Sequence, residues 1–592
     1  MTTAGLTWQQ LRDLKLSQLE DVGDRWNEVS GRSDASRTQV DRAMSARLRE
    51  TQESESAEAA LGRLKRLSRN FHYLHTECGL VRTTLNGLAS ELAEPQRQLR
   101  QALEDAAALK FSVLEDGSIS YPAVVTETLT GDQREASGGK VQGSARLPVE
   151  PPGWGGNAPS PFQPLNPNAE KAQVIADQIA RAVRAAVEID VRYARTLDRL
   201  KAAKGLDVTE AVLQDVMHDM DAVRTAADRY LDSGIPQSKS PAENKVWWDG
   251  LSEEQRQEYL EIAPDLVGGL DGVPVIARDE ANRNYLPVLI DSLARQDGDE
   301  AHSKLDALQL IDEKLKRPGH PPMFLLGIGD EGNGRAIIAY GNPDMSRNVS
   351  AYVPGLGTKL NKDFVEGTMK RAQDTALGAQ NIDPSSASIV WLGYDAPQSV
   401  DVMGTGDAKK GAPSYNHFMA GLEATNEHSD PHLTAIGHSY GSLTVGTAAK
   451  QAGGIPGADD IILLGSPGVG VDNAQDLGVG KKHVFVGSAE NDPVTHLPTK
   501  EEAFFAGPLG VLVYGDAFDR GNDDIYFGKD PASEAFGAQR FKVDPGPRPI
   551  LEMGGFDAHS QYFTPEKDMV SAENIATIVA GRPEDVIRDG YR

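Results

Sequence analysis

The sequence is poor in cysteine, in basic residues and in long apolar runs, and each shortage excludes a class of protein. A single cysteine, Cys78, rules out intrachain disulfides and zinc sites with several thiolate ligands. The chain has 60 basic and 87 acidic residues, and the net charge of −27 repels nucleic acid and anionic lipid headgroups. No apolar run approaches the ~20 residues of a membrane span, and residues 1–20 lack a signal-peptide pattern. We therefore expect no nucleic-acid partner and no transmembrane segment.

The chain contains enough apolar sequence for several folded domains. Its 592 residues are 39% hydrophobic, and a chain of that length predicts roughly three or four domains. We divide it into a helical module at 1–110, a β-hairpin with a Gly/Pro-rich linker at 111–168, a helical connector at 169–240 and a catalytic α/β domain at 241–592.

A heptad seam dominates the helical module. Apolar residues alternate at spacings of three and four from Leu64 to Leu92, which predicts a long helix covered by a partner helix. The earlier helices near 11–29 and 40–48 are the natural partners, and Pro95 should end or kink the long helix. Cys78 lies on the seam, so we interpret it as a small buried apolar residue and not as a reactive thiol.

The region between the helical module and the α/β domain contains a hairpin, a linker and two helices in turn. Residues 111–121 alternate around Asp116-Gly117, which predicts a hairpin. Residues 131–168 are rich in Gly, Pro and Ser, which is typical of a linker. Two helices are then expected at 169–204 and 208–232.

Short apolar runs alternate with helical stretches after Trp247. This alternation predicts a mostly parallel sheet covered by helices on both faces, with functional sites beyond the carboxyl ends of the strands. The expected strands are 323–329, 335–340, 348–353, 388–392, 433–436, 460–464, 483–486 and 540–543. The expected helices include 362–377, 415–424, 442–451 and 572–580.

The segment Gly437-His438-Ser439-Tyr440-Gly441 fits the pattern G-x-S-x-G between a short apolar strand and a helix of small residues. A serine on such a turn is strained with its hydroxyl exposed, and the two glycines leave room where a Cβ would collide. The helix dipole beneath it favours a developing oxyanion. We therefore predict Ser439 as a nucleophile; the alternative is a glycine-rich turn without a catalytic role.

A serine hydroxyl needs a base, and in this type of fold the acid and then the histidine follow the serine along the chain. Asp492 follows an apolar strand and is the predicted acid, with Glu490 as its rival. His496 lies only four residues from that acid, so we predict His559 as the base. Asp492 would fix its tautomer and stabilise the imidazolium.

Two backbone N–H groups should bind the oxyanion. We predict those of Tyr440, after the nucleophile, and Leu356, in the loop 354–357 that follows a strand; a tight turn without a further role is the alternative for that loop. Asp395 and His438 are candidate substrate contacts, although a structural turn is the favoured alternative for Asp395.

Several segments together resemble an uncharacterised actinobacterial α/β-hydrolase family. They are "WWDGLSEEQRQEYLEIAPDLVGGLDGVPVIARDEANR", "IVWLGYDAP", "GHSYGS", "LLGSPGVGV" and "HSQYF", and they cover roughly residues 247–575. The resemblance implies an α/β-hydrolase fold with a triad of Ser439, Asp492 and His559, and neither a metal nor an organic cofactor is needed.

Residues 1–110 resemble the helical hairpins of WXG-type proteins, which accompany type VII secretion. The segment "ESESAEAALGRLKRL" lies where that group has its turn, although Ala60-Leu61-Gly62 keeps only the glycine of its signature. Tyr73-x-x-x-Glu77 matches the export pattern of the group, with a helix-surface tyrosine as the favoured alternative. The resemblance implies a helical protein partner, and export without a signal peptide as the alternative to a cytoplasmic location.

The combined pattern predicts a serine hydrolase that cleaves a small-molecule or lipid ester through an acyl-enzyme. The segments 404–415 and 497–533 lack clear strands, and we expect them to form a lid. Acyl transfer or amide cleavage on the same fold is one alternative. A degenerate interaction protein or a secretion-linked effector is another.

Overall fold

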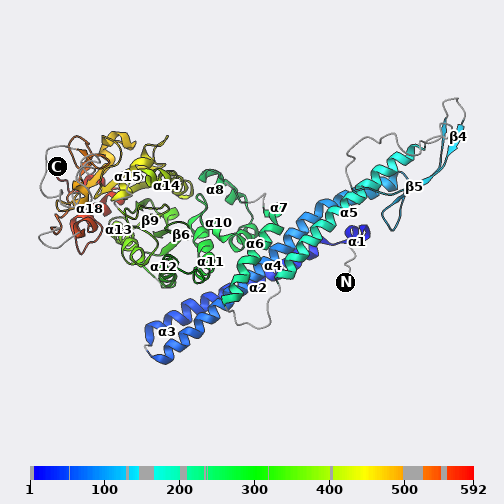
Figure 1. Ribbon diagram of the computed structural model, residues 1–592, viewed down its shortest axis with the longest axis horizontal. Helices are drawn as coiled ribbons and strands as arrows, with labels where there is room; N and C mark the ends of the chain where they lie inside the picture. Colours follow the sequence, from blue (N-terminus) through cyan, green and yellow to red (C-terminus); the bar gives the residue numbers. More distant parts are fainter. Residues whose placement is uncertain are drawn as a thin grey trace. The chain divides into compact units, whose positions relative to one another are not determined.

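The chain forms two compact units, one of Met1–Val40 with Glu53–Ile235 and one of Asp41–Gln52 with Pro236–Arg592 (Figure 1). A computed structural model shows both. It describes residues 6–52, 54–127, 133–145, 166–200, 210–231, 235–236, 238–317, 319–399, 404–497, 524–548 and 556–591. No helix among these residues combines the length and the apolar character of a membrane span.

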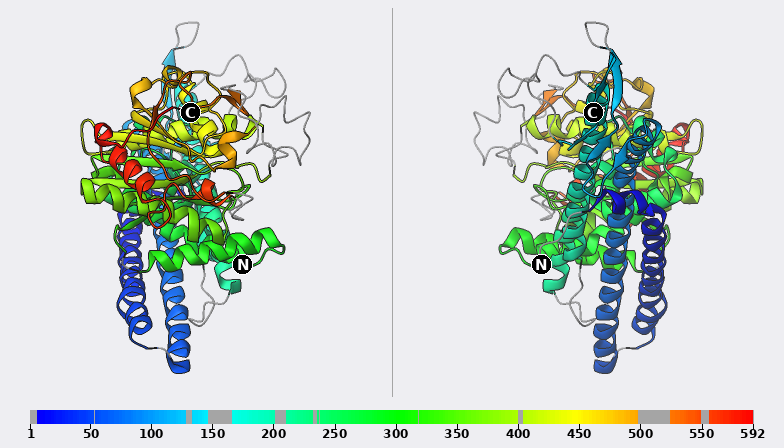
Figure 2. Two further views of the ribbon diagram at one scale, coloured as in Figure 1. Left: turned by 90° about the vertical axis from the view of Figure 1, so that its left-hand side faces the viewer. Right: turned by 90° about the vertical axis from the view of Figure 1, so that its right-hand side faces the viewer.

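The first unit is built on long helices, of which α2 and α4 run side by side (Figure 2). The predicted seam helix is α4, and Cys78, Leu85, Leu88 and Leu92 on the seam are buried. The helices of this unit are α1 (Trp8–Asp13), α2 (Leu16–Thr38), α4 (Glu55–Ala108), α5 (Pro167–Arg199), α6 (Glu210–Ala226) and α7 (Asp228–Leu231). The chain between α2 and α4 forms the π-helix η1 (Gln39–Ser45) and α3 (Ala46–Thr51).

Of the two outcomes expected at Pro95, an end of the helix is wrong. The helix α4 continues through Pro95 to Ala108, because α5 packs beside this part and shares a core with it. Tyr73 is 6% exposed, so it is not a surface tyrosine.

Leu92 and Leu99 of α4 pack in one cluster with Ile175 and Ile179 of α5. The helical module and the connector therefore share one hydrophobic core.

The predicted hairpin is confirmed as β1 (Ser112–Val113) and β2 (Ile119–Tyr121), which pair antiparallel across a turn where Gly117 has a φ of 78°. The expected linker is partly ordered, because β4 (Gln133–Ala136) pairs with β3 (Val124–Glu127) and β5 (Gly139–Val141) pairs with β2. Residues 146–165 of that linker, and the ends of the two helices expected at 169–204 and 208–232, lie outside the described residues.

An eight-stranded sheet forms the centre of the second unit, in the order β15-β12-β11-β10-β8-β9-β7-β6. Its strands are β6 (Met323–Gly329), β7 (Arg335–Tyr340), β8 (Asn348–Val353), β9 (Ser386–Leu392), β10 (His432–His438), β11 (Ala458–Leu464), β12 (Val484–Gly487) and β15 (Gln539–Arg540). The strand β7 is antiparallel to both of its neighbours, and the other pairs are parallel. Seven of the predicted strands are therefore present with small differences at their ends, and the strand expected at 540–543 is present only as the two-residue β15.

Helices cover both faces of this sheet. Neighbouring residues of β10 point to opposite faces, so Ala435 joins one core with Tyr415 of α14, and Ile436 joins another with Met369 of α13. The helices of this unit are α8 (Pro241–Gly250), α9 (Glu253–Ile262), α10 (Pro264–Gly268), α11 (Val275–Leu293), α12 (Asp299–Leu315), α13 (Met369–Ile382), α14 (Gly406–Thr425), α15 (Tyr440–Ala449), α17 (Asp557–Ser560) and α18 (Met569–Val579).

The expected lid is wrong for its first segment. Residues 406–415 are the beginning of α14, and Ala408, Ala412 and Tyr415 are buried in the core that this helix forms against the sheet. In the second segment, residues 498–523 lie outside the described residues. The part that follows forms a short hairpin of β13 (Asp524–Ile525) and β14 (Gly528–Lys529).

Candidate active site

Ser439 occupies a strained turn between β10 and α15. Its backbone has a φ of 56° and a ψ of −131°, a conformation that residues with a side chain rarely adopt. Its N–H donates to the Leu464 carbonyl at 2.9 Å, and its carbonyl accepts from the Ser442 N–H at 3.0 Å. These bonds hold the turn that the G-x-S-x-G pattern predicts.

The two glycines of the motif have the steric role that we expected. A Cβ at Gly437 would lie 2.6 Å from the Cα of Ser442, and one at Gly441 would lie 2.1 Å from the carbonyl oxygen of Val353. Both neighbours are backbone atoms, which cannot move aside as a flexible side chain can. The close approach of β10, α15 and the end of β8 therefore requires glycine at both positions.

Asp492 and His559 form a buried hydrogen-bonded pair. The Nδ1 of His559 lies 2.9 Å from Oδ2 and 3.0 Å from Oδ1 of Asp492, whose exposure is 0%. Tyr562 Oη donates to Oδ2 at 2.6 Å, and the Val494 N–H donates to Oδ1 at 2.9 Å. Burial alone would raise the pKa of Asp492, but His559, Tyr562 and Val494 outweigh it and lower that pKa. Because the ionised carboxylate accepts from Nδ1–H, the Nε2 of His559 is left to take up a proton.

The rival acid and base have other surroundings than this pair. Glu490 is exposed, and the Nε2 of His496 donates to the Glu490 carbonyl at 3.0 Å. Of the two possible acids, the structure thus pairs Asp492 with His559.

The end of β11 lies between the serine and the Asp492–His559 pair. Leu464 accepts the Ser439 N–H, and a Cβ on the next residue, Gly465, would lie 2.7 Å from Oδ2 of Asp492 and 2.8 Å from Nδ1 of His559. The end of β11 therefore contacts both the backbone of Ser439 and the Asp492–His559 pair, at the carboxyl ends of the neighbouring strands β10 and β11. Sequence reasoning missed both Gly465 and Tyr562; their only signals are a glycine directly after an apolar strand and a tyrosine one helical turn beyond the histidine.

The loop after β8 lies against the nucleophile. A Cβ on Gly355 would lie 2.6 Å from Cβ of Ser439 and 2.8 Å from the backbone nitrogen of Tyr440. This is the loop in which we predicted the second oxyanion donor, Leu356, and Gly355 of that loop approaches the elbow closely. A hydrogen bond of 2.8 Å from the Gly357 N–H to the Pro397 carbonyl helps to fix the loop.

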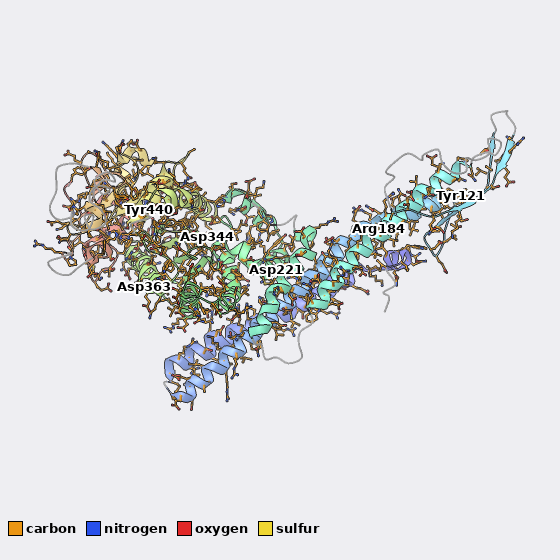
Figure 3. All side chains as sticks on the ribbon, viewed as in Figure 1. Tyr121, Arg184, Asp221, Asp344, Asp363 and Tyr440 are labelled. Atoms are coloured by element: carbon orange, nitrogen blue, oxygen red, sulfur yellow. The ribbon has the colours of Figure 1, made fainter. Side chains whose placement is uncertain are left out.

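Tyr440, which Figure 3 labels, joins the starts of α15 and α14 by its backbone and its hydroxyl. Its backbone begins α15, while its buried hydroxyl donates to the Gly404 carbonyl and accepts from the Ala408 N–H at the start of α14. Burial raises the pKa of Tyr440 to about 12, so the hydroxyl stays neutral. The side chain thus serves packing, and the backbone N–H remains at the helix N-terminus.

Both candidate substrate contacts, Asp395 and His438, form hydrogen bonds within the protein. Asp395 accepts hydrogen bonds from Arg335 at 2.8 and 3.0 Å and from the Asn333 N–H at 2.7 Å, and Arg335 above all lowers the pKa of Asp395. His438 is 4% exposed, and its Nε2 lies 2.7 Å from the His559 carbonyl. These contacts favour the structural alternative for Asp395 and a positioning role for His438. In the described part of the chain, no group of three His, Cys, Asp or Glu side chains could hold a metal ion.

Comparisons with known proteins identify the family of this chain. A family described as alpha/beta hydrolase matches residues 330–502. An uncharacterised protein of Mycobacterium bovis is 37% identical over 215 residues, which are 35% of this chain and 79% of that protein. The chain belongs to this alpha/beta hydrolase family. The matched range includes Ser439 and Asp492 and ends before His559.

Other similarities of this hydrolase are more distant. An uncharacterised protein of Mycobacterium tuberculosis is 28% identical over 381 residues, 58% of this chain. The hydrolase spans about half of that relative, 56% of its length. Solved esterases from Rhizomucor miehei and Pyrobaculum calidifontis match 51% of this chain and 96% and 97% of their own, with TM-scores of 0.27 and 0.25 and identities of 12% and 14%.

Proposed function

We propose that the second unit is a serine hydrolase that cleaves a carboxylic ester through an acyl-enzyme. The observation that carries this proposal is the strained Ser439 at the strand ends where a buried carboxylate orients His559. A turn that stores backbone strain needs support from its surroundings, and such turns gather at functional sites. The second unit provides that support through glycines at three close backbone contacts.

The proposed reaction uses each member of the site in turn. Ser439 Oγ attacks the ester carbonyl carbon while Nε2 of His559 takes its proton, and Asp492 stabilises the resulting imidazolium. The tetrahedral intermediate collapses, the C–O bond to the alcohol breaks, and His559 returns the proton to the departing oxygen. Water then attacks the acyl-enzyme with His559 again as the base, and this step releases the acid and frees Ser439.

The backbone N–H groups of Tyr440 and Leu356 are the proposed oxyanion donors. The Tyr440 N–H is at the first turn of α15, where the helix has no carbonyl for it. Leu356 follows Gly355, which touches the elbow. Donors held before the reaction need no rearrangement as charge develops, and one such donor contributes roughly 10²–10³-fold in kcat.

An ester with an apolar group is the proposed substrate class. Phe556 is 52% exposed, and its ring centroid lies 6.5 Å from that of His559. Leu356, beside the elbow, is only partly buried. Apolar side chains beside the proposed base and in the loop beside the elbow favour an acyl or lipid ester over a highly polar one.

A helical protein partner is a second, separate proposal for the first unit. Val22, Trp26 and Val29 lie at helical spacing on α2 and are 41%, 39% and 43% exposed, and an exposed apolar stripe favours contact with another protein. Tyr73 and Glu77, the residues of the export pattern, are both buried in α4. Their burial does not favour an export signal that is read from the folded protein.

Labelling with a fluorophosphonate probe tests the hydrolase proposal. We expect the wild-type chain to be labelled and Ser439→Ala to remain unlabelled, because the probe reacts with an activated serine. Ser429→Ala, at an exposed serine of the same unit, is the matched control and should be labelled like the wild type. An unlabelled wild type, or a labelled Ser439→Ala variant, would contradict the proposal.

Adding an alcohol acceptor during ester turnover, and analysing the products, separates hydrolysis from acyl transfer.

A further inference from the structure

His438, the last residue of β10, is enclosed by aromatic rings. The ring centroids of Tyr352, Tyr562 and Phe563 lie 6.5, 6.0 and 5.9 Å from the His438 centroid, each in an edge-to-face arrangement. On its other side the ring stacks on His559, with centroids 4.5 Å apart and planes inclined by 30°. A polar ring at 4% exposure needs hydrogen-bond partners, so its two nitrogens decide what it does.

The two nitrogens of His438 have different partners. Nε2 lies 2.7 Å from the carbonyl oxygen of His559, which can only accept, so Nε2 carries the proton. Nδ1 faces the Nη1 of Arg371 at 3.5 Å, and the same Nη1 donates to Tyr352 Oη at 3.0 Å. Burial, and then the neighbouring His559 and Arg371, lower the pKa of His438 well below its ordinary value. The ring is therefore neutral, with one fixed tautomer.

The carbonyl that His438 holds belongs to the proposed base. His559 lies on α17, a helix of four residues that cannot position its own backbone as a long helix does. Asp492 fixes the direction of the imidazole ring, but it does not hold the main chain of residue 559. The hydrogen bond from His438 supplies that second point of attachment.

His438 is also the residue directly before Ser439. It ends a fully enclosed strand, which is paired on both sides with β8 and β11. One residue therefore joins the main chain of the proposed base to the strand that carries the proposed nucleophile. A displacement of about 1 Å between reacting groups costs about 10²-fold in rate, so such a link affects turnover directly.

We propose that His438 is a positioning residue, whose Nε2–H holds the His559 carbonyl and so keeps the imidazole in register with the Ser439 hydroxyl. The inference rests on the proposed hydrolase function and assigns a role within it to the second residue of the G-x-S-x-G segment. The opposing explanation is that the ring only fills space in the core. The two explanations differ in what a side chain without a donor does to turnover.

Substitutions at the two ends of β10 separate these explanations. His438→Leu keeps an apolar side chain but loses the donor, and His438→Gln places an amide N–H near the original Nε2. His432→Leu, at the opposite end of the same strand, is the matched control for losing a histidine from β10. The measurements are kcat and KM for p-nitrophenyl butyrate, with thermal melting to establish that each variant is folded. If His438→Leu does not fold, His438→Asn replaces it, because its shorter amide cannot reach the His559 carbonyl.

We expect His438→Leu to lower kcat about 10- to 100-fold with little change in KM, because the base and not the substrate is displaced. His438→Gln should recover most of that loss, and His432→Leu should keep the kcat of the wild type. Wild-type kcat in His438→Leu, or a His438→Gln variant as slow as His438→Leu, would overturn the positioning role alone. A wild-type chain without fluorophosphonate labelling or ester turnover would overturn the hydrolase function and this inference together.

Discussion

The two ends of the central sheet carry the same pair of side chains in different surroundings. At the amino ends of the strands, buried Asp460 lies 2.8 Å from a nitrogen of both His432 and His483. At the carboxyl ends, buried Asp492 lies 2.9 Å from Nδ1 of His559. A histidine on a buried aspartate therefore occurs twice in one domain and does not by itself define a site.

The backbone makes the difference between the two ends. Around Asp492, a Cβ on the glycine that follows β11 would collide with both members of the pair, and a serine with positive φ follows the next strand. Around Asp460, the histidines join the starts of β10 and β12 to β11, and neither Asp460 nor the two histidines have a positive φ. Under the proposed function, the comparison teaches that strain and close backbone approach distinguish the proposed reactive arrangement from a structural one.

The largest expected effect belongs to the serine. Ser439→Ala should reduce turnover of p-nitrophenyl butyrate by about 10⁶-fold, since removal of the nucleophile leaves only binding and oxyanion contributions. His559→Ala should come close to the same loss, and the double variant should be no worse than either single one. Initial rates of the three variants check this prediction, and additive losses would argue against a shared reaction.

Exchanging the two aspartates for asparagine compares the two ends of the sheet directly. Asp492→Asn should lower kcat by about 10⁴-fold, because an amide favours the wrong tautomer of the histidine. Asp460→Asn should leave kcat unchanged while lowering the melting temperature. Equal effects of the two changes on kcat would mean that the carboxyl-end pair is structural as well.

The variant Tyr562→Phe tests how much a single hydroxyl contributes to the Asp492–His559 pair. It removes the 2.6 Å hydrogen bond to Asp492, and we expect a loss of about tenfold in kcat, as for a hydrogen bond to a charged group. Tyr415→Phe removes another buried hydroxyl, which donates to the Ala351 carbonyl, and should leave kcat unchanged. A slower Tyr415→Phe variant would show that any buried hydroxyl has this effect.

The smallest expected effect is a pH dependence of stability at the amino ends. Burial opposes protonation of His432, but the hydrogen bond and charge of Asp460 outweigh it, so the pKa of His432 is raised. The contribution of protonated His432 to the free energy of unfolding is therefore complete below about 6.5, the pKa of a histidine in the unfolded chain. It is lost as pH rises through the pKa of His432 in the folded protein. The wild type should melt a few degrees lower at pH 9 than at pH 6, and His432→Leu should show less of this change. An identical pH dependence in both proteins would exclude His432 as its source.

The sequence predicted the sheet well because its strands are apolar on both faces and end at glycine or proline turns. It indicated Ser439 and Asp492 because each follows such a run, and His559 because the other histidine beyond the acid, His496, lies only four residues from it. It missed the start of α14, since the segment 404–415 showed no clear strand and was expected to form a lid, whereas packing of Ala408 and Tyr415 against the sheet keeps that segment helical. Gly465 and Tyr562 act through contacts between distant segments, and no local pattern reports such contacts.

Trapping the acyl-enzyme tests the central claim most directly. The wild-type chain would be mixed with p-nitrophenyl butyrate, quenched in acid during turnover, digested and analysed by peptide mass spectrometry. The account predicts a butyryl group on Ser439, and none on that residue when the Ser439→Ala variant is treated in the same way. Ester turnover with the butyryl group on another residue, or with no covalent intermediate at all, would contradict it.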